Sequence, residues 1–162
     1  MEIVRLVSRE GIQAMFMGEY HHSIDDKNRL IIPSSLRQQT KENKNKDEFV
    51  ITRGLEQSLF LYPTSEWQSL GERLKNLSTT KSNSRAFVRL LFSGAHPVQP
   101  DTQGRITLPQ GLKNFAQIEE KVVIIGAFNK IEIWNEERWE KYYKQQRSIF
   151  EELSEEIMDV GI

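Results

Sequence analysis

Two short charged segments carry the residues best suited to chemistry in this sequence. The first reads Asp25-Asp26-Lys27-Asn28-Arg29, and the second, 76 positions later, reads Asp101-Thr102-Gln103-Gly104-Arg105. Each contains Asp-x-x-x-Arg, with a proline eight positions after the Asp (Pro33 and Pro109). Asp favours turns because it hydrogen-bonds the backbone that follows it, and Asn tolerates a positive φ. Each segment is therefore expected to form a tight turn that carries an arginine.

The arginines of these turns could have either of two roles. In one, each Asp pairs with its own Arg and the pair only holds the turn in shape. In the other, an exposed Arg contacts a phosphate or pairs with a guanine edge. Exposed ion pairs contribute only about 0–1 kcal/mol, so fold stability alone does not explain them. The chemistry of the residues leaves both roles open.

The second role defines a set of candidate site residues. The candidates for DNA binding are Lys27, Arg29 and Arg105, and those for shaping the turns are Asp25, Asn28, Asp101 and Gly104. Gln103 occupies the position in the second turn that Lys27 occupies in the first. The two turns are therefore not expected to be equivalent.

The sequence gives little support for an enzyme, a metal site or a cofactor, and none is expected. It has no Gly-x-x-x-x-Gly-Lys-Ser/Thr phosphate loop, no Gly-x-Ser-x-Gly elbow and no cysteine. Its three histidines (His21, His22, His96) are too few and too scattered for a zinc site. A hydrolase using His21 or His22 with Asp25, and a module that binds a protein partner, are the alternatives to DNA binding.

The charge distribution is compatible with nucleic acid although the formal net charge is −1. Residues 132–162 contain nine acidic and four basic side chains, a balance of −5. Residues 1–131 contain fourteen acidic and eighteen basic side chains, a balance of +4. The net charge of the chain therefore conceals a mildly basic segment over residues 1–131. For binding, the local electrostatic field of that segment matters more than the net charge. No apolar run approaches the roughly 18 residues of a membrane span, so no membrane association is expected.

The chain is predicted to contain two copies of one small unit. Six pairs of residues keep an offset of 76: Phe16/Phe92, Gly18/Gly94, Asp25/Asp101, Arg29/Arg105, Pro33/Pro109 and Leu36/Leu112. The offset then falls to 72, as in Val50/Val122, Gly54/Gly126 and Trp67/Trp139. The difference falls in a charged loop over residues 41–48, where an insertion is easily tolerated. A dozen ordered matches with one gap indicate an internal duplication.

Each unit is expected to be mainly β. The first reads as a strand over residues 16–24, the charged turn, a strand over 30–32, a helical turn over 33–39 and a hairpin of strands over 49–52 and 58–62. Because so small a unit buries little core alone, the two copies are expected to pack together with pseudo-two-fold symmetry. The fold class is therefore α+β with a mainly β core.

Helices are expected outside the β units. Two are predicted between the units, the first beginning near Thr64 as N-cap and the second spanning about residues 81–92. A long C-terminal helix is predicted from Asn135 onward. Its mostly apolar stripe consists of Trp139, Tyr143, Phe150, Leu153 and Ile157. This stripe could pack on the body or contact another subunit, and the pattern leaves both open.

Several motifs together resemble the bacterial MraZ family. They are Phe16-Met17-Gly18-Glu19-Tyr20, Asp25-x-x-x-Arg29-Leu30-x-x-Pro33, Thr52-Arg53-Gly54-Leu55, Leu61-Tyr62-Pro63, Phe92-Ser93-Gly94-Ala95, Asp101-x-x-Gly104-Arg105 and Phe128-Asn129-Lys130-x-Glu132-x-Trp134. The resemblance covers the chain from about residue 15 to its end. This sequence departs from the family at Asn28, which replaces the more usual Gly. Asn tolerates left-handed geometry, so the turn is expected to survive.

The resemblance implies a fold, a domain organisation and a function. It implies tandem swapped-hairpin units of the SpoVT-AbrB type that pair within the chain, over residues 19–66 and 95–138. A helical linker over 67–94, a C-terminal helix over 139–162 and an N-terminal extension over 1–14 complete the expected domains. It further implies a cytoplasmic, nucleoid-associated transcription repressor of the division and cell-wall gene cluster. This regulator would bind repeated double-stranded promoter sites as a ring-shaped homo-oligomer.

Overall fold

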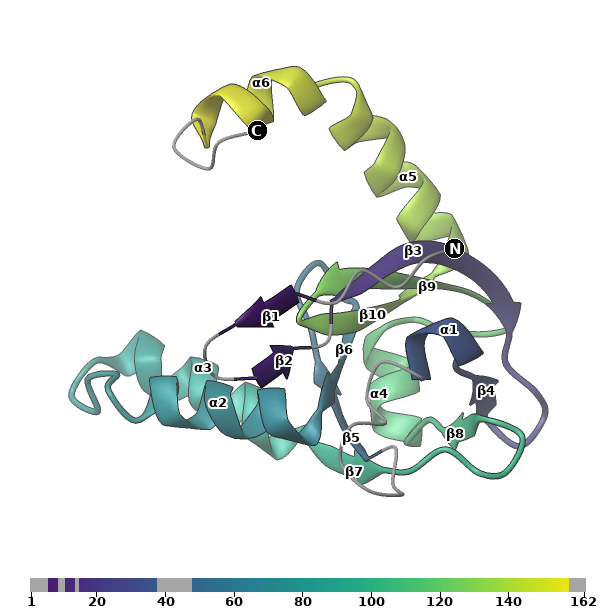
Figure 1. Ribbon diagram of the computed structural model, residues 1–162, viewed down its shortest axis with the longest axis horizontal. Coiled ribbons are helices and arrows are strands. Elements are labelled where there is room, and N and C mark those ends of the chain that lie inside the picture. Colours follow the sequence, from purple (N-terminus) through teal and green to yellow (C-terminus); the bar gives the residue numbers. More distant parts are fainter. Residues whose placement is uncertain (1–5, 9–10, 14, 38–47, 158–162) are drawn as a thin grey trace.

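The computed structural model describes residues 6–8, 11–13, 15–37 and 48–157. The expected charged loop over 41–48 lies outside the described residues except for Glu48. Before the first repeat, β1 (Leu6–Ser8) and β2 (Gly11–Gln13) form a small antiparallel pair (Figure 1). The rest of the described chain forms one β core with helices around it.

The core contains a six-stranded antiparallel sheet and a separate two-stranded ribbon. The sheet has the order β3 (Phe16–Ser23), β9 (Lys121–Phe128), β10 (Lys130–Asn135), β6 (Leu59–Pro63), β5 (Phe49–Arg53) and β7 (His96–Val98). The ribbon pairs β4 (Arg29–Ile31) with β8 (Arg105–Thr107). The expected α+β fold with a mainly β core is confirmed.

The two halves of the chain exchange strands. β3 of the first half pairs with β9 of the second, with Phe16 opposite Phe128. In return, β7 of the second half pairs with β5 of the first. The halves also meet where β6 pairs with β10, and there Phe60 lies opposite Glu132, its counterpart 72 positions later. These reciprocal pairings are the swapped arrangement that the resemblance implies.

The buried side chains come from matching positions of both halves. Leu30 and Ile106, which are opposite each other in the ribbon, are 0% and 1% exposed. Two short helices, α1 (Ser34–Arg37) and α4 (Gln110–Phe115), bury Leu36 and Leu112 in the same core. Full burial of one such side chain contributes about 1.5–3 kcal/mol. This shared core fixes the ribbon, and with it the two charged turns, to the sheet.

Two helices connect the halves, as expected: α2 (Thr64–Leu74) and α3 (Ser82–Ser93). The prediction that Thr64 caps α2 is wrong, because α2 follows β6 without a connecting residue and Pro63 holds the cap position. The Thr64 hydroxyl instead donates to the Glu48 carbonyl. The Trp67 ring packs against Tyr62 at 5.7 Å and against Phe92 at 4.8 Å. These ring contacts join both helices to the sheet.

The C-terminal segment differs from the single long helix that was expected. It consists of α5 (Glu136–Arg147), capped by the Asn135 side chain, and α6 (Phe150–Glu156). Near the break, the Ser148 hydroxyl donates to the Gln145 carbonyl, a competing bond that disfavours a continuous helix. None of the helices in the described part of the chain is long and apolar enough to cross a membrane.

Candidate nucleic-acid interface

The first charged turn is built around the carboxylate of Asp25. Its Oδ1 accepts hydrogen bonds from the backbone N–H groups of Lys27 (2.9 Å) and Arg29 (2.8 Å). Its Oδ2 accepts from Nε of Arg29 at 2.7 Å. The Asn28 N–H donates to the Asp25 carbonyl, and Asn28 adopts a left-handed φ of 59°. One carboxylate thus closes the turn and holds the arginine side chain.

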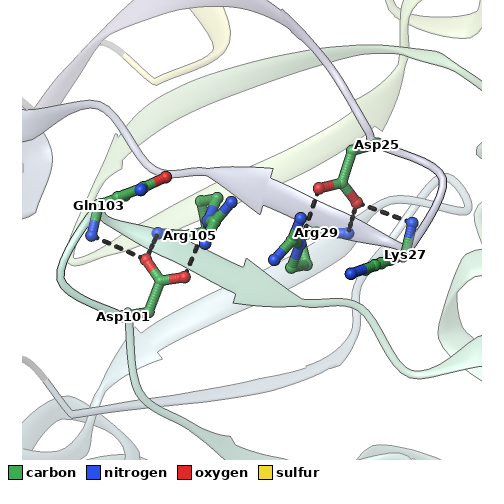
Figure 2. A network of polar contacts seen from close by, with 6 residues as sticks. All are labelled: Asp25, Lys27, Arg29, Asp101, Gln103 and Arg105. Atoms are coloured by element: carbon green, nitrogen blue, oxygen red, sulfur yellow. Dashed lines mark hydrogen bonds and ion pairs between the residues drawn. The ribbon is translucent and has the colours of Figure 1, made fainter.

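The second turn repeats this geometry. Oδ1 of Asp101 accepts from the N–H groups of Gln103 and Arg105, both at 2.9 Å, and Oδ2 accepts from Nε of Arg105 at 2.8 Å. The φ of Gly104 is 80°, in the same left-handed region as Asn28. Figure 2 shows the two networks as near-copies at the two ends of the ribbon. The duplication therefore preserves the detailed bonding of the turn as well as its sequence pattern.

Strand pleating places both arginines on the same face of the ribbon. Successive side chains of a strand alternate between faces, and directly opposed residues share a face. Arg29 lies opposite Thr107, and Arg105 lies opposite Ile31. Leu30 and Ile106 occupy the other face and fill the core, so these four residues face outward. Figure 2 shows Arg29 and Arg105 on this ribbon, between the two turns.

Each arginine has hydrogen-bonding capacity left for a ligand. The side chains of Arg29 and Arg105 are 28% and 24% exposed. Each guanidinium bonds its aspartate through Nε. Within the described residues, the remaining Nη groups of both arginines make no recorded hydrogen bond. The aspartate thus fixes the orientation of each guanidinium, and the Nη donors remain available to an acceptor on a ligand.

Each half also contributes a cation that packs against the turn of the other half. The sequence analysis did not identify these two cations. Nζ of Lys113 on α4 donates to Oδ1 of Asn28 at 3.0 Å, and the Asn28 amide donates to Gln110 at 3.2 Å. In the second turn, a Cβ on Gly104 would collide with the guanidinium of Arg37 on α1. Arg37 and Lys113 share the 76-residue offset, a signal that could have identified them.

The histidine next to the first turn serves a structural contact and does not pair with Asp25. Nε2 of His21 lies 3.0 Å from Glu19 and its Nδ1 lies 3.3 Å from Glu136 on α5. Hydrogen bonds that the imidazole donates to the carboxylates of Glu19 and Glu136 raise the pKa of His21. The described residues contain no recorded bond between Asp25 and either His21 or His22, and no cluster of three metal-ligating side chains. The pairing needed by the hydrolase alternative is therefore missing from this geometry.

The turn carboxylates give the interface a defined response to acid. Hydrogen bonds from the arginine backbone N–H, then from the arginine side chain, lower the pKa of both Asp25 and Asp101. Because the carboxylate has a lower pKa in the folded state than in the unfolded state, its ionisation stabilises the turn at pH values above the unfolded pKa of about 4. This stabilisation is lost as the pH falls through the folded-state pKa.

We therefore expect the turns to keep their geometry from neutral pH down to about 5 and to open below about 4. NMR shifts of the backbone amides of Arg29 and Arg105 would follow this opening. Replacing Asp25 and Asp101 with Asn should remove the acid transition of these two amides. An unchanged transition in that double variant would show that other groups control it.

The structure thus defines a class of internally duplicated proteins, in which a strand-exchanged β core carries two paired Asp-x-x-x-Arg turns. The chain matches the model of the MraZ protein family twice, over residues 15–90 and 91–160, and it belongs to that family. The resemblance seen in the sequence is confirmed.

Curated relatives support the same assignment. "Transcriptional regulator MraZ" of Natranaerobius thermophilus is 46% identical over 148 residues, which cover 91% of this chain and all of the relative. The protein of the same name from Moorella thermoacetica is 44% identical over the same share of both chains. These relatives are named as regulators and not as enzymes, in agreement with the expectation that this chain is not an enzyme.

Proposed function

We propose that this protein is a DNA-binding transcriptional regulator whose paired turns contact double-stranded DNA. The observation that carries the proposal is the placement of Arg29 and Arg105 on one outward face of a two-stranded ribbon. The names of the curated relatives support the same function. Asp25, Asn28, Asp101 and Gly104 shape the turns in this proposal.

A two-stranded ribbon suits the major groove of DNA. That groove is about 12 Å wide and admits such a ribbon. An arginine can pair with both O6 and N7 of guanine, the commonest specific contact in the groove. Arg29 and Arg105 take this role, and the exposed Lys27 supplies attraction to a phosphate. Because Gln103 replaces that lysine in the second turn, the first turn contributes more electrostatic affinity.

The small number of cations in one chain favours an assembled form. Lys27, Arg29 and Arg105 alone give modest affinity for DNA. Several linked subunits raise the effective concentration of each turn near neighbouring sites, so weak contacts suffice together. We therefore propose a ring-shaped homo-oligomer that binds repeated promoter sites.

The resemblance to the family supplies the proposed biological setting. The target is the division and cell-wall gene cluster, on which the protein acts as a repressor in the cytoplasm, associated with the nucleoid. The SpoVT-AbrB units span residues 19–66 and 95–138 in this proposal. Residues 1–14 are the extension, residues 67–94 the helical linker and residues 139–162 the C-terminal helical segment.

DNA affinity is expected to fall steeply with salt, because each cation–phosphate contact releases counterions. The logarithm of the binding constant should decrease linearly with that of salt concentration, with a slope of about 0.9 per phosphate contacted. A gel shift on DNA upstream of the protein's own gene, repeated from low to physiological salt, measures this slope. A slope of several units would indicate several engaged subunits, whereas affinity indifferent to salt would contradict the proposal.

A further inference from the structure

An open apolar cleft lies mainly on the first half of the chain, and Phe115 of the second half adds to its lining. It has a volume of about 360 Å³, within the range of roughly 300–1,000 Å³ typical of binding pockets. Its lining comes from α2, α3, α4 and the β5–β6 hairpin and includes Leu55, Phe60, Tyr62, Leu70, Phe87 and Leu90. Leu55 and Leu90 are each 59% exposed, and Phe87 is 45% exposed. Apolar surface of this kind marks an interaction site.

The second half fills the matching position with its own side chains. Tyr62 and Leu70 correspond, 72 positions later, to Trp134 and Tyr142. The rings of Trp134 and Tyr142 pack 5.0 Å apart, and Trp139 lies 5.3 Å from Trp134. Aromatic side chains thus cover the sheet in the second half. The larger aromatic Tyr142 thus stands in the second half where Leu70 lines the cleft in the first.

Helix α6 and the Ile157 residue that follows it present apolar side chains that are largely exposed, with Leu153 half-buried between them. Phe150 is 70% exposed and Ile157 is 54% exposed, and no residue of α6 is buried. Figure 1 shows α6 at the end of an arm that leaves the body along α5 and then bends. Phe150, Leu153 and Ile157 follow the i, i+3, i+7 spacing of a helix that inserts into a groove.

The charges of the two surfaces are complementary. Helix α6 carries four carboxylates and no cation: Glu151, Glu152, Glu155 and Glu156. The segment from α2 to α3, residues 64–93, carries five cations against two carboxylates. Arg53 also lines the cleft, so a cation lies at the cleft itself.

We propose that α6 of one copy of the chain docks into the apolar cleft of a second copy. Every copy has one arm and one cleft, so the contact is head-to-tail and generates a closed ring or an open filament. The inference deepens the oligomer of the proposed function and rests on it. It assigns the two surfaces that join neighbouring subunits: the acidic helix α6 and the apolar cleft beside the net-positive segment of residues 64–93.

Two defective variants, used alone and mixed, test this contact. The arm variant replaces Phe150 and Leu153 with Ser, and the cleft variant is Leu90→Glu. Phe128→Ser is the control, because Phe128 is 60% exposed but does not line the cleft. Light scattering during size-exclusion chromatography gives the mass of each, and circular dichroism reports the fold. If Leu90→Glu unfolds, Phe87→Ser replaces it as the cleft variant.

The head-to-tail contact makes a specific mixing prediction. Each defective variant alone should have the mass of one chain, and the control should keep the mass of the wild type. An equimolar mixture should give a complex of two chains, because it contains one intact arm and one intact cleft that can meet. Retention of the full assembly by either variant, a mixture that stays monomeric, or a monomeric wild type would each overturn the inference.

The outcomes separate this inference from the proposed function. A wild type that assembles through this contact but binds no DNA would refute the proposed function and leave the contact standing. DNA binding by a variant that stays fully assembled without the apolar face of α6 would refute the contact and leave the function standing.

Discussion

Replacing Arg29 and Arg105 together with Ala is expected to abolish measurable binding to the promoter DNA. A bidentate pair between arginine and guanine discriminates by about 1–3 kcal/mol, which is roughly 5- to 150-fold in affinity. Both losses occur in every subunit of an assembly, so the total effect exceeds that of one turn. Fluorescence anisotropy of labelled promoter DNA at constant salt measures the change.

The matched control for this experiment removes a cation elsewhere. Arg85 on α3 donates to the Thr79 carbonyl and lies outside the ribbon, so Arg85→Ala should leave DNA affinity nearly unchanged. Light scattering must show that the assembly persists in the double variant. Unchanged DNA binding would refute the role of the turns. Loss of folding would instead indicate that the Asp–Arg pairs only hold the turns, as the partner-binding alternative requires.

Gly126→Ala is expected to weaken the strand exchange directly. A Cβ at Gly126 would collide with the backbone of β3, where it meets the Met17 nitrogen and lies 2.5 Å from the Phe16 carbonyl carbon. Backbone atoms cannot move aside without disturbing the pairing of β3 with β9. Overpacking of this kind costs about 1–3 kcal/mol, occasionally more. Thermal unfolding should show a midpoint lower by roughly 2–12 °C for a chain of this size.

The duplication supplies a control for this substitution. Gly54 is the counterpart of Gly126, but a Cβ there would meet only side chains, Ser58 Oγ at 2.6 Å and Phe60 Cδ1 at 2.7 Å. Side chains relax more easily than a paired backbone, so Gly54→Ala should lower the midpoint less. An equal decrease of the unfolding midpoint in the two variants would show that β3 shifts to accommodate the added methyl group without loss of the strand exchange.

The local features of the fold were predictable because they depend on neighbouring residues. The apolar runs predicted the β5–β6 hairpin, which spans Phe49–Arg53 and Leu59–Pro63. The constant offset between Asp25 and Asp101 predicted that the chain repeats itself. The strand exchange followed only from the family resemblance, because residue patterns do not state which distant strand pairs with which.

Features that depend on tertiary contacts escaped prediction. The break between α5 and α6 lies within an apolar stripe that is compatible with one continuous helix. The bracing of Asn28 by Lys113 joins residues that are far apart in sequence. The pleat that turns Arg29 and Arg105 to the same face depends on the register between β4 and β8. Single-sequence patterns contain no direct information about such a register.

The strand exchange also constrains how the protein is made. β3 leaves the ribosome about 100 residues before its partner β9, a delay of about 5–20 s at ordinary synthesis rates. β4 is likewise synthesised before β8, the strand with which it pairs. A chain interrupted before residue 105 therefore lacks one strand of the ribbon and one of its arginines. Both halves must therefore be synthesised before either charged turn can sit on a paired ribbon.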